Sequence, residues 1–122
     1  MYYKSYSGHN HPVHRGDIYY VNFGFNPGSV IGGIRPALVI QNDTGNRYST
    51  TLIVAAISTR LKKCQQPTHI YIGRKFGLTK ESMLLLEQIT TINKSDLLDF
   101  VGHVSNEFMF SVNRACALSV GL

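Results

Sequence analysis

The sequence predicts a mainly β fold with some α structure: a small β-barrel or strongly twisted antiparallel sheet, followed by one C-terminal helix. Short segments rich in β-branched and aromatic residues, about six in all, are separated by turn signals at short spacing. The last segment instead carries apolar residues at helical spacing. The 122 residues amount to one domain, without an internal repeat or a low-complexity segment.

The first strand is expected at 18–23, where β-branched and aromatic residues dominate. The glycine-rich stretch 24–33 follows as a long loop, and loops of this length in small domains are often binding loops or lids. The residues before Arg15 show neither a strand period nor a helix period. We therefore expect 1–14 to be an extension or flexible arm and 15–122 to be the folded domain.

Two apolar runs, 37–40 and 51–57, predict covered strands. Pro36 disfavours the helical region for Arg35, and proline is tolerated at the first residue of a strand. Arg35 is therefore expected at the mouth of the first of these strands, delivered there by the glycine-rich loop.

The rest of the sheet is predicted from shorter patterns. Residues 42–47 are expected to form a polar turn, and 68–72 alternates like a half-buried strand. Residues 83–86 and 88–92 indicate either two short strands or one bent strand interrupted at Glu87.

The C-terminal part begins with a capping signature at 93–96, which predicts a helical turn through Leu98. A last short strand is expected at 100–104. Ser105 then caps a helix that runs toward Leu118. One apolar face of this helix comprises Phe108, Val112, Ala115 and Cys116. That face packs in the core or partly against a second subunit, and the sequence leaves both possibilities open.

Composition and charge narrow the class of partner and the compartment. The formal net charge of +5 favours polyanions such as nucleic acid, an acidic protein or anionic lipid. No apolar run approaches the roughly 18 residues of a membrane span, and the N-terminus lacks the apolar core of a secretory signal. Two cysteines are too few for a disulfide framework. These features predict a cytoplasmic protein without a membrane partner.

Several motifs are missing from the sequence. There is no phosphate-binding loop, no dinucleotide fingerprint, no H-E-x-x-H and no C-x-x-C, so we expect neither a metal site nor a cofactor. The spacing of His9, His11 and His14 matches no zinc pattern, which favours a solvated tail over metal ligands. An enzyme of this composition would act on an anionic substrate with arginine, hydroxyl and amide groups.

Cleavage of RNA can be achieved with such groups. The 2′-hydroxyl is an internal nucleophile next to the phosphorus, so the protein has only to align it and stabilise the developing charge. Arg35 and Ser58, both at strand ends, could donate to the same phosphate. The alternative for Arg35 is an ion pair on the surface.

Binding of single-stranded RNA needs stacking, base pairing and attraction to the backbone. Phe23 and Phe25 could stack on bases, and the amide of Gln88 could pair with them. The candidate RNA-binding residues are Phe23, Phe25, Ser29, Arg60, Lys62, Lys63, Gln88 and Thr90, with Arg74 and Lys75 as further backbone contacts.

An ordered set of stretches resembles the MazF/PemK-type (Kid-like) toxin endoribonucleases of toxin–antitoxin systems, and most closely the MazF proteins of Gram-positive bacteria. The set is specific as a series, whereas a lone Arg-Pro would not be. The matching stretches are 15–19, 32–43, 45–47, 53–57, 67–69 and 86–92.

The resemblance implies an SH3-like barrel of the CcdB/MazF type and a homodimer. It implies metal-independent, sequence-specific cleavage of single-stranded mRNA, leaving a 2′,3′-cyclic phosphate and a 5′-hydroxyl. It also implies an acidic, partly disordered antitoxin as partner. The family's catalytic arginine falls on Arg35 and its catalytic threonine on Ser58, a departure that keeps the hydroxyl, with Thr59 as a possible substitute. Val30 and Ile31 depart from the polar residues usual in this loop.

Other interpretations stay open at this point. Ser58 and the altered loop are also compatible with a catalytically weak or inactive SH3-like module that binds RNA or protein. A gyrase-poisoning toxin on the related CcdB-type barrel is a third possibility. We interpret His69 and His103 as packed or edge histidines rather than bases. Glu87 is either a general base or an ion-pair partner of Arg35, with the structural role favoured.

Overall fold

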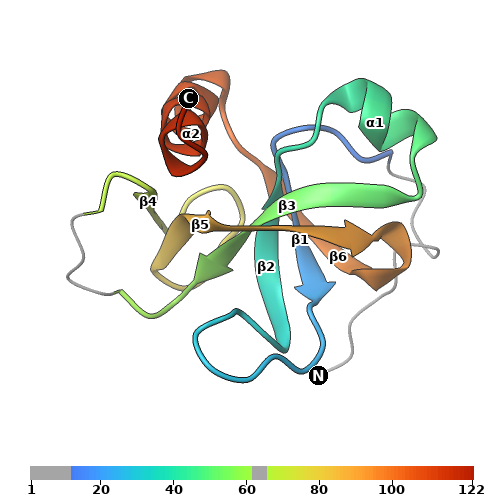
Figure 1. Cartoon of the computed structure of the whole chain (residues 1–122), viewed down its shortest axis with the longest axis horizontal. Coiled ribbons are helices and arrows are strands. Elements are labelled where there is room, and N and C mark those ends of the chain that lie inside the picture. Colours follow the sequence, from blue (N-terminus) through green and yellow to red (C-terminus); the bar gives the residue numbers. More distant parts are fainter. Residues whose placement is uncertain (1–11, 62–65) are drawn as a thin grey trace.

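The computed structural model describes residues 12–61 and 66–122, which form one curled antiparallel sheet and two helices (Figure 1). The order of strands in the sheet is β4-β5-β3-β2-β1-β6. The strands are β1 (Asp17–Asn22), β2 (Ile34–Val39), β3 (Thr51–Ser58), β4 (His69–Gly73), β5 (Ser82–Asn93) and β6 (Leu97–His103). The helices are α1 (Asp43–Tyr48) and α2 (Asn106–Ser119). The predicted twisted antiparallel sheet with a C-terminal helix is confirmed.

Two cores lie on opposite faces of the central strands, since successive strand residues point to opposite faces. Ile18 and Leu38 belong to one cluster, and Tyr19 and Val39 to the other. Strands buried on both faces have continuous apolar sequences rather than alternating ones. This explains the apolar runs that predicted β2 and β3.

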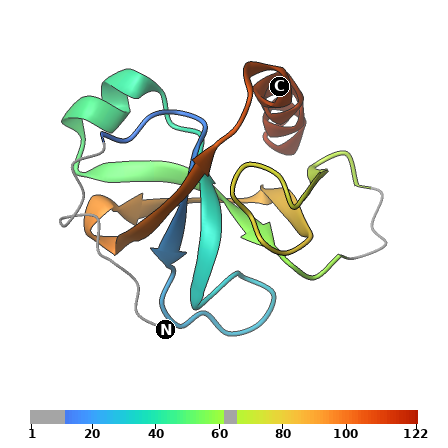
Figure 2. The ribbon, with the colours of Figure 1, turned by 180° about the vertical axis from the view of Figure 1, so that it is seen from behind.

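Helix α2 closes the first core. It contacts β4 and β5, and Figures 1 and 2 show it standing at one end of the curled sheet. Its N-cap is Ser105, whose Oγ accepts a hydrogen bond from the Phe108 N–H at 3.1 Å. Val112 and Ala115 are buried, as the predicted apolar face requires. Within the described residues, no helix is long and apolar enough to cross a membrane.

The predicted broken segment at 83–92 is one bent strand, β5. Ala55 of β3 pairs with Ile89, but the next residue, Ala56, pairs with Leu85. The segment Leu86–Gln88 is therefore left out of the regular register as a bulge. Bulges bend a strand and redirect its side chains, and here the Gln88 side chain bonds to the loop between β1 and β2.

Two predicted turns are wrong in detail. Where a turn was predicted at 42–47, the chain forms helix α1 (Asp43–Tyr48). Asn42 caps this helix: its Oδ1 accepts from the Gly45 N–H at 2.8 Å. The turn at 93–96 is a short 3₁₀ helix, Lys94–Asp96, and Leu97 already begins β6.

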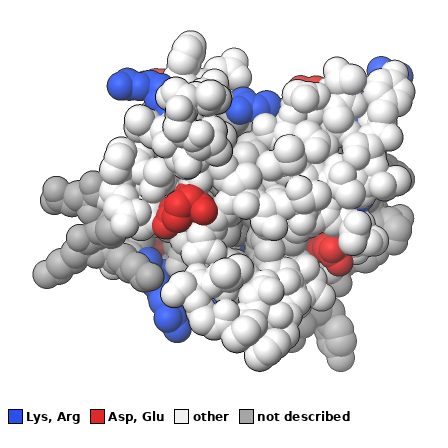
Figure 3. All heavy atoms as spheres, in the orientation of Figure 1, with Lys and Arg blue, Asp and Glu red and all other residues white. Residues whose placement is uncertain are grey.

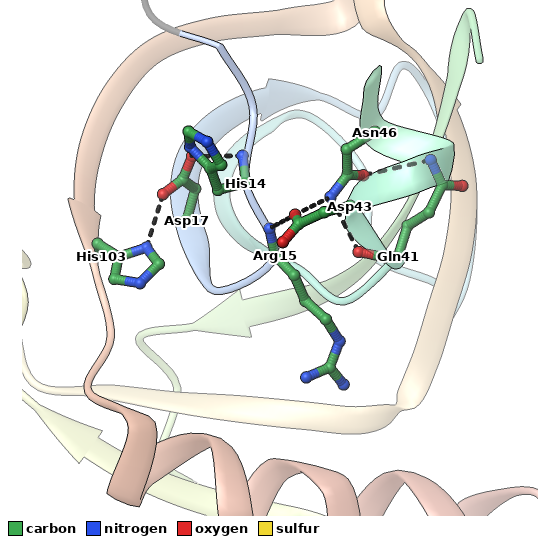
Figure 4. Close-up of polar contacts among 7 residues, drawn as sticks. All are labelled: His14, Arg15, Asp17, Gln41, Asp43, Asn46 and His103. Atoms are coloured by element: carbon green, nitrogen blue, oxygen red, sulfur yellow. Dashed lines mark hydrogen bonds and ion pairs between the residues drawn. The ribbon is translucent and has the colours of Figure 1, made fainter. Parts of the chain in front are cut away.

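Polar contacts around the start of β1 join it to β6 and α1 (Figure 4). The buried Asp17 carboxylate accepts from the His14 N–H at 2.8 Å, and its other oxygen lies 2.7 Å from His103 Nδ1. The Arg15 N–H donates to Asp43 Oδ1 at 2.7 Å, and this hydrogen bond is the main reason why the pKa of Asp43 is lowered. Val13 is already buried in the second core. The domain division after residue 14 stays a prediction.

Candidate functional site

An open cavity of about 650 Å³ lies between the β1–β2 loop, the ends of β3 and β4, and the bulge of β5. Arg35 and Ser58, the two predicted catalytic residues, both line it. The wall also includes Phe25, Ser29, Val30, Ile31, Arg60, His69, Met83, Glu87 and Gln88. Residues from well-separated parts of the chain therefore meet at one end of the sheet.

Arg35 is the second residue of β2, so it lies inside the strand and not before it as the sequence suggested. It pairs with Val21 of β1, whereas the pairing of β2 with β3 begins only at Ala37. The start of β2 is thus an open edge, where Pro36 is tolerated. Arg35 Nε donates to the Gly32 carbonyl at 2.9 Å. Its terminal amino groups have no hydrogen bond within the described residues and are available for a ligand.

Ser58 is the last residue of β3 and is 5% exposed. Its Oγ accepts from the Arg60 N–H at 3.1 Å. An accepting hydroxyl keeps its own proton to donate, so Ser58 can offer a hydrogen bond to a ligand in the cavity. Thr59, considered as a substitute, is exposed and is not part of the cavity wall.

The β1–β2 loop is held in place by hydrogen bonds. Gly33 has a φ of +75° and donates to the Gly24 carbonyl at 2.7 Å, which closes the base of the loop. Gln88 holds its other end: Oε1 accepts from the Ile31 N–H and Nε2 donates to the Ser29 carbonyl, both at 2.9 Å. The predicted contact of Gln88 with RNA bases stays a prediction, and these two bonds leave the amide one N–H and one lone pair for it.

The remaining predicted RNA-binding residues divide into three groups. Phe25, Ser29 and Arg60 line the same cavity as Arg35, with Phe25 91% exposed. Phe23 and Thr90 line a neighbouring cavity of about 620 Å³, which shares Ser29 and Gln88 with the first. Lys62 and Lys63 lie outside the described residues. The two further backbone contacts, Arg74 and Lys75, are exposed but line neither cavity.

A histidine–carboxylate pair completes the wall. His69 Nε2 lies 2.5 Å from Glu87 Oε2, and the two side chains are 5% and 37% exposed. The predicted ion pair of Glu87 with Arg35 is wrong, because the partner of Glu87 is His69. The sequence did not indicate this pair, since it depends on the register in which His69 opposes Leu85, just before the bulge.

The charges near the cavity are few. The described residues that line it include two cations, Arg35 and Arg60, and one carboxylate, Glu87. On the face shown in Figure 3, Lys and Arg side chains lie apart at the margin and do not form a stripe. Across residues 12–61 and 66–122, no group of three or more His, Cys, Asp or Glu side chains is placed to hold a metal ion.

The curled sheet and its cavity define a class: a small β-rich protein with an open cavity, lined by an arginine of β2 and a buried hydroxyl at the end of β3. The chain belongs to the family of PemK-like, MazF-like toxins of type II toxin–antitoxin systems, which matches residues 14–120.

Relatives of known function agree with this family. The chain is 46% identical to the endoribonuclease EndoA of Bacillus subtilis, over 90% of this chain and 96% of the relative. It is 47% identical to the endoribonuclease MazF of Staphylococcus saprophyticus, over 90% of this chain and 92% of the relative. The predicted resemblance to MazF proteins of Gram-positive bacteria is confirmed.

Solved structures agree at the level of the fold. MazF from Deinococcus radiodurans has a TM-score of 0.79 with 18% identity, and covers 93% of this chain and 100% of its own. A mycobacterial endoribonuclease in complex with its cognate antitoxin has a TM-score of 0.75 with 25% identity, and covers 90% of this chain and 96% of its own.

Proposed function

We propose that this chain is the toxin of a type II toxin–antitoxin system and cleaves single-stranded mRNA at a short sequence, without a metal ion. The observation that carries the proposal is the meeting of the Arg35 guanidinium and the Ser58 hydroxyl in one open cavity. The family and the endoribonuclease relatives support it.

The chemistry follows from the two groups. The 2′-oxygen attacks the adjacent phosphorus and the 5′-oxygen leaves, which gives a 2′,3′-cyclic phosphate and a 5′-hydroxyl. The planar guanidinium of Arg35 can bind two phosphate oxygens and stabilise the extra negative charge of the transition state. Since an arginine side chain stays protonated in proteins, Arg35 stabilises charge and does not supply the proton. Ser58 donates to a phosphate oxygen from the other wall.

We further propose an acidic antitoxin, a homodimer and a cytoplasmic location. A net charge of +5 and the exposed apolar residues Phe25 and Val30 beside the cavity suit an acidic chain with apolar anchors. Exposed Phe110 of α2 suits a contact between two copies. A cognate antitoxin that leaves RNA cleavage unchanged would contradict the first proposal, and a monomeric mass by light scattering would contradict the second.

A catalytically inactive RNA-binding module is the second candidate. It is favoured by one observation, the serine at position 58 where the family's catalytic threonine is expected. Such a protein would bind RNA in a salt-dependent way and leave it intact. Detection of a cyclic-phosphate product excludes it.

The test is cleavage of single-stranded RNA in excess EDTA. We expect the wild-type protein to cut, and Arg35→Ala to lose on the order of 10²–10³-fold in rate. Arg114→Ala is the matched control, because Arg114 is an exposed arginine of α2 that lines neither cavity. Intact RNA with folded wild-type protein would refute the proposed function.

A further inference from the structure

We propose that Glu87 is the proton acceptor for the attacking 2′-hydroxyl and that His69 is the residue that positions it. This inference rests on the proposed function and assigns the proton acceptor, a role that Arg35 and Ser58 leave unfilled. Neither of these two can accept a proton readily, since arginine stays charged and a neutral hydroxyl is a weak base.

The geometry makes Glu87 the exposed member of the pair. Both residues belong to the cavity wall, but the side chain of Glu87 is 37% exposed and that of His69 only 5%. Glu87 lies in the bulge at Leu86–Gln88, whose residues have no partner in β3. In a regular ladder Glu87 would be paired with a residue of β3. A carboxylate in this position can reach a ligand, whereas the imidazole acts only through the carboxylate.

The buried side of His69 indicates its tautomer. Nδ1 of His69 is buried and has no hydrogen-bond partner within the described residues. A proton on Nδ1 would therefore have no acceptor. A buried N–H without an acceptor is costly. The neutral tautomer with its proton on Nε2 avoids this N–H and donates to Glu87 Oε2 at 2.5 Å. His69 thus fixes one oxygen of the carboxylate and leaves the other for substrate.

The proposed step is balanced as follows. The 2′-hydroxyl gives its proton to the free oxygen of Glu87 while the O2′–P bond forms. The P–O5′ bond breaks and its electron pair goes to the 5′-oxygen, which takes a proton from water. The hydroxide so formed takes the proton from Glu87, so the carboxylate is restored and no net proton is consumed.

The other charged groups that face the pair are known from the cavity wall. Besides His69 on β4, they are Arg35 on β2 and Arg60 after β3, among the residues that the structure describes. Arginine side chains stay protonated in proteins. A change of rate with pH on the acidic side therefore reports on the His69–Glu87 pair.

The experiment measures single-turnover cleavage of a short RNA against pH for wild type, Glu87→Gln and Glu81→Gln, with binding measured on the same RNA carrying a 2′-deoxy sugar at the cut position. We expect Glu87→Gln to slow cleavage on the order of 10²–10⁴-fold and to remove the acidic limb of the profile. Its affinity for the uncleavable RNA should not weaken. Glu81→Gln, at an exposed carboxylate bonded to Tyr71, should behave as wild type.

His69 is tested by rescue. His69→Ala should slow cleavage and change the acidic limb, and His69→Gln, which still offers an N–H to Glu87, should recover part of the rate. Binding of the 2′-deoxy RNA should stay unchanged in both. If Glu87→Gln does not fold, Glu87→Asp keeps the carboxylate and should retain the acidic limb at a lower rate.

The outcomes separate this inference from the proposed function. Wild-type protein that cuts RNA, together with a Glu87→Gln variant of equal rate and unchanged pH profile, overturns the role of Glu87 and leaves the function standing. Folded wild-type protein that cuts no RNA overturns both. An equal loss of affinity and rate in Glu87→Gln also overturns the inference, because it shows a role in binding.

Discussion

Ser58 is a buried residue whose hydroxyl can still donate a hydrogen bond to a ligand in the cavity. It ends β3, is 5% exposed, and offers its proton to the cavity while Oγ accepts from the Arg60 N–H. Threonine at this position would add a methyl group that restricts χ1 to fewer rotamers. The serine should therefore keep the donor but hold it less rigidly.

We expect Ser58→Ala to slow RNA cleavage on the order of 10²-fold, because it removes one hydrogen-bond donor from the transition state. Ser58→Thr should equal or exceed the wild-type rate, since it keeps the hydroxyl and stiffens it. Single-turnover rates on one RNA measure both. A Ser58→Ala protein as fast as wild type would remove Ser58 from the mechanism.

Asp43 makes stability depend on pH. Its pKa is lowered from 3.8, mainly by the hydrogen bond from the Arg15 backbone N–H, so it stabilises the fold above about pH 3.8. This contribution is lost as the pH falls through the lowered value. We expect Asp43→Asn to be less stable than wild type near neutral pH, by less than about 1 kcal/mol since the group is exposed.

Denaturant unfolding at several pH values checks this prediction. The difference between wild type and Asp43→Asn should shrink in acid below pH 3.8. A difference that grows as the pH falls would contradict the assignment of the lowered pKa to the Arg15–Asp43 contact.

The sequence could predict a site residue where a local pattern in the chain marks its position. Arg35 and Ser58 stand at the ends of apolar runs, and the structure brings both to one cavity. The His69–Glu87 pair could not be predicted, because it requires the register of β4 on β5. The Gln88 bonds to the loop were missed for a similar reason, because Gln88 lies 57 positions after Ile31 and 59 positions after Ser29 in the sequence.

At the scale of elements, apolar patterns predicted the strands correctly, whereas the polar sequence of 42–47 led to a wrong prediction of a turn. The continuous apolar runs of β2 and β3 reflect burial on both faces of the sheet. Helix α1 has a polar sequence of weak helix formers, so propensity favoured a turn. Its Asn42 cap and its contacts with β3 decide otherwise. The break at Glu87 correctly indicated the bend of β5.

Strand β6 passes close to the β4–β5 connection at Gly102, and this close approach predicts the effect of a substitution there. A Cβ atom on Gly102 would lie 2.0 Å from the Phe76 carbonyl oxygen, which is backbone and cannot yield easily. Gly102→Ala should therefore destabilise the fold on the order of 3 kcal/mol. The midpoint of urea unfolding measures the effect.

Gly28→Ala serves as the control for Gly102→Ala. Gly28 has a φ of +78° but open space around the added Cβ, so alanine there should cost only about 1–2 kcal/mol through its backbone conformation. If Gly102→Ala is as stable as wild type, β6 and the β4–β5 connection do not approach as closely as described.

At the scale of the whole molecule, one sheet serves two purposes. Its curled middle has a core on each face, and its open end, where β2 leaves β3, holds the cavity. The loop and the bulge of β5 complete that end from opposite sides and are joined through Gln88. The fold thus keeps Arg35 and Ser58 on the sheet and holds the loop beside them through hydrogen bonds.

The central claim is that the cavity of Arg35 and Ser58 directs the 2′-hydroxyl of RNA onto its own phosphate. The most direct measurement is analysis of both new ends after cleavage of one RNA in EDTA, with a copy that carries a single 2′-deoxy sugar at the cut position. We predict a 2′,3′-cyclic phosphate, a 5′-hydroxyl, and no cut in the deoxy copy. A 5′-phosphate end, or equal cleavage of the deoxy copy, would contradict the account.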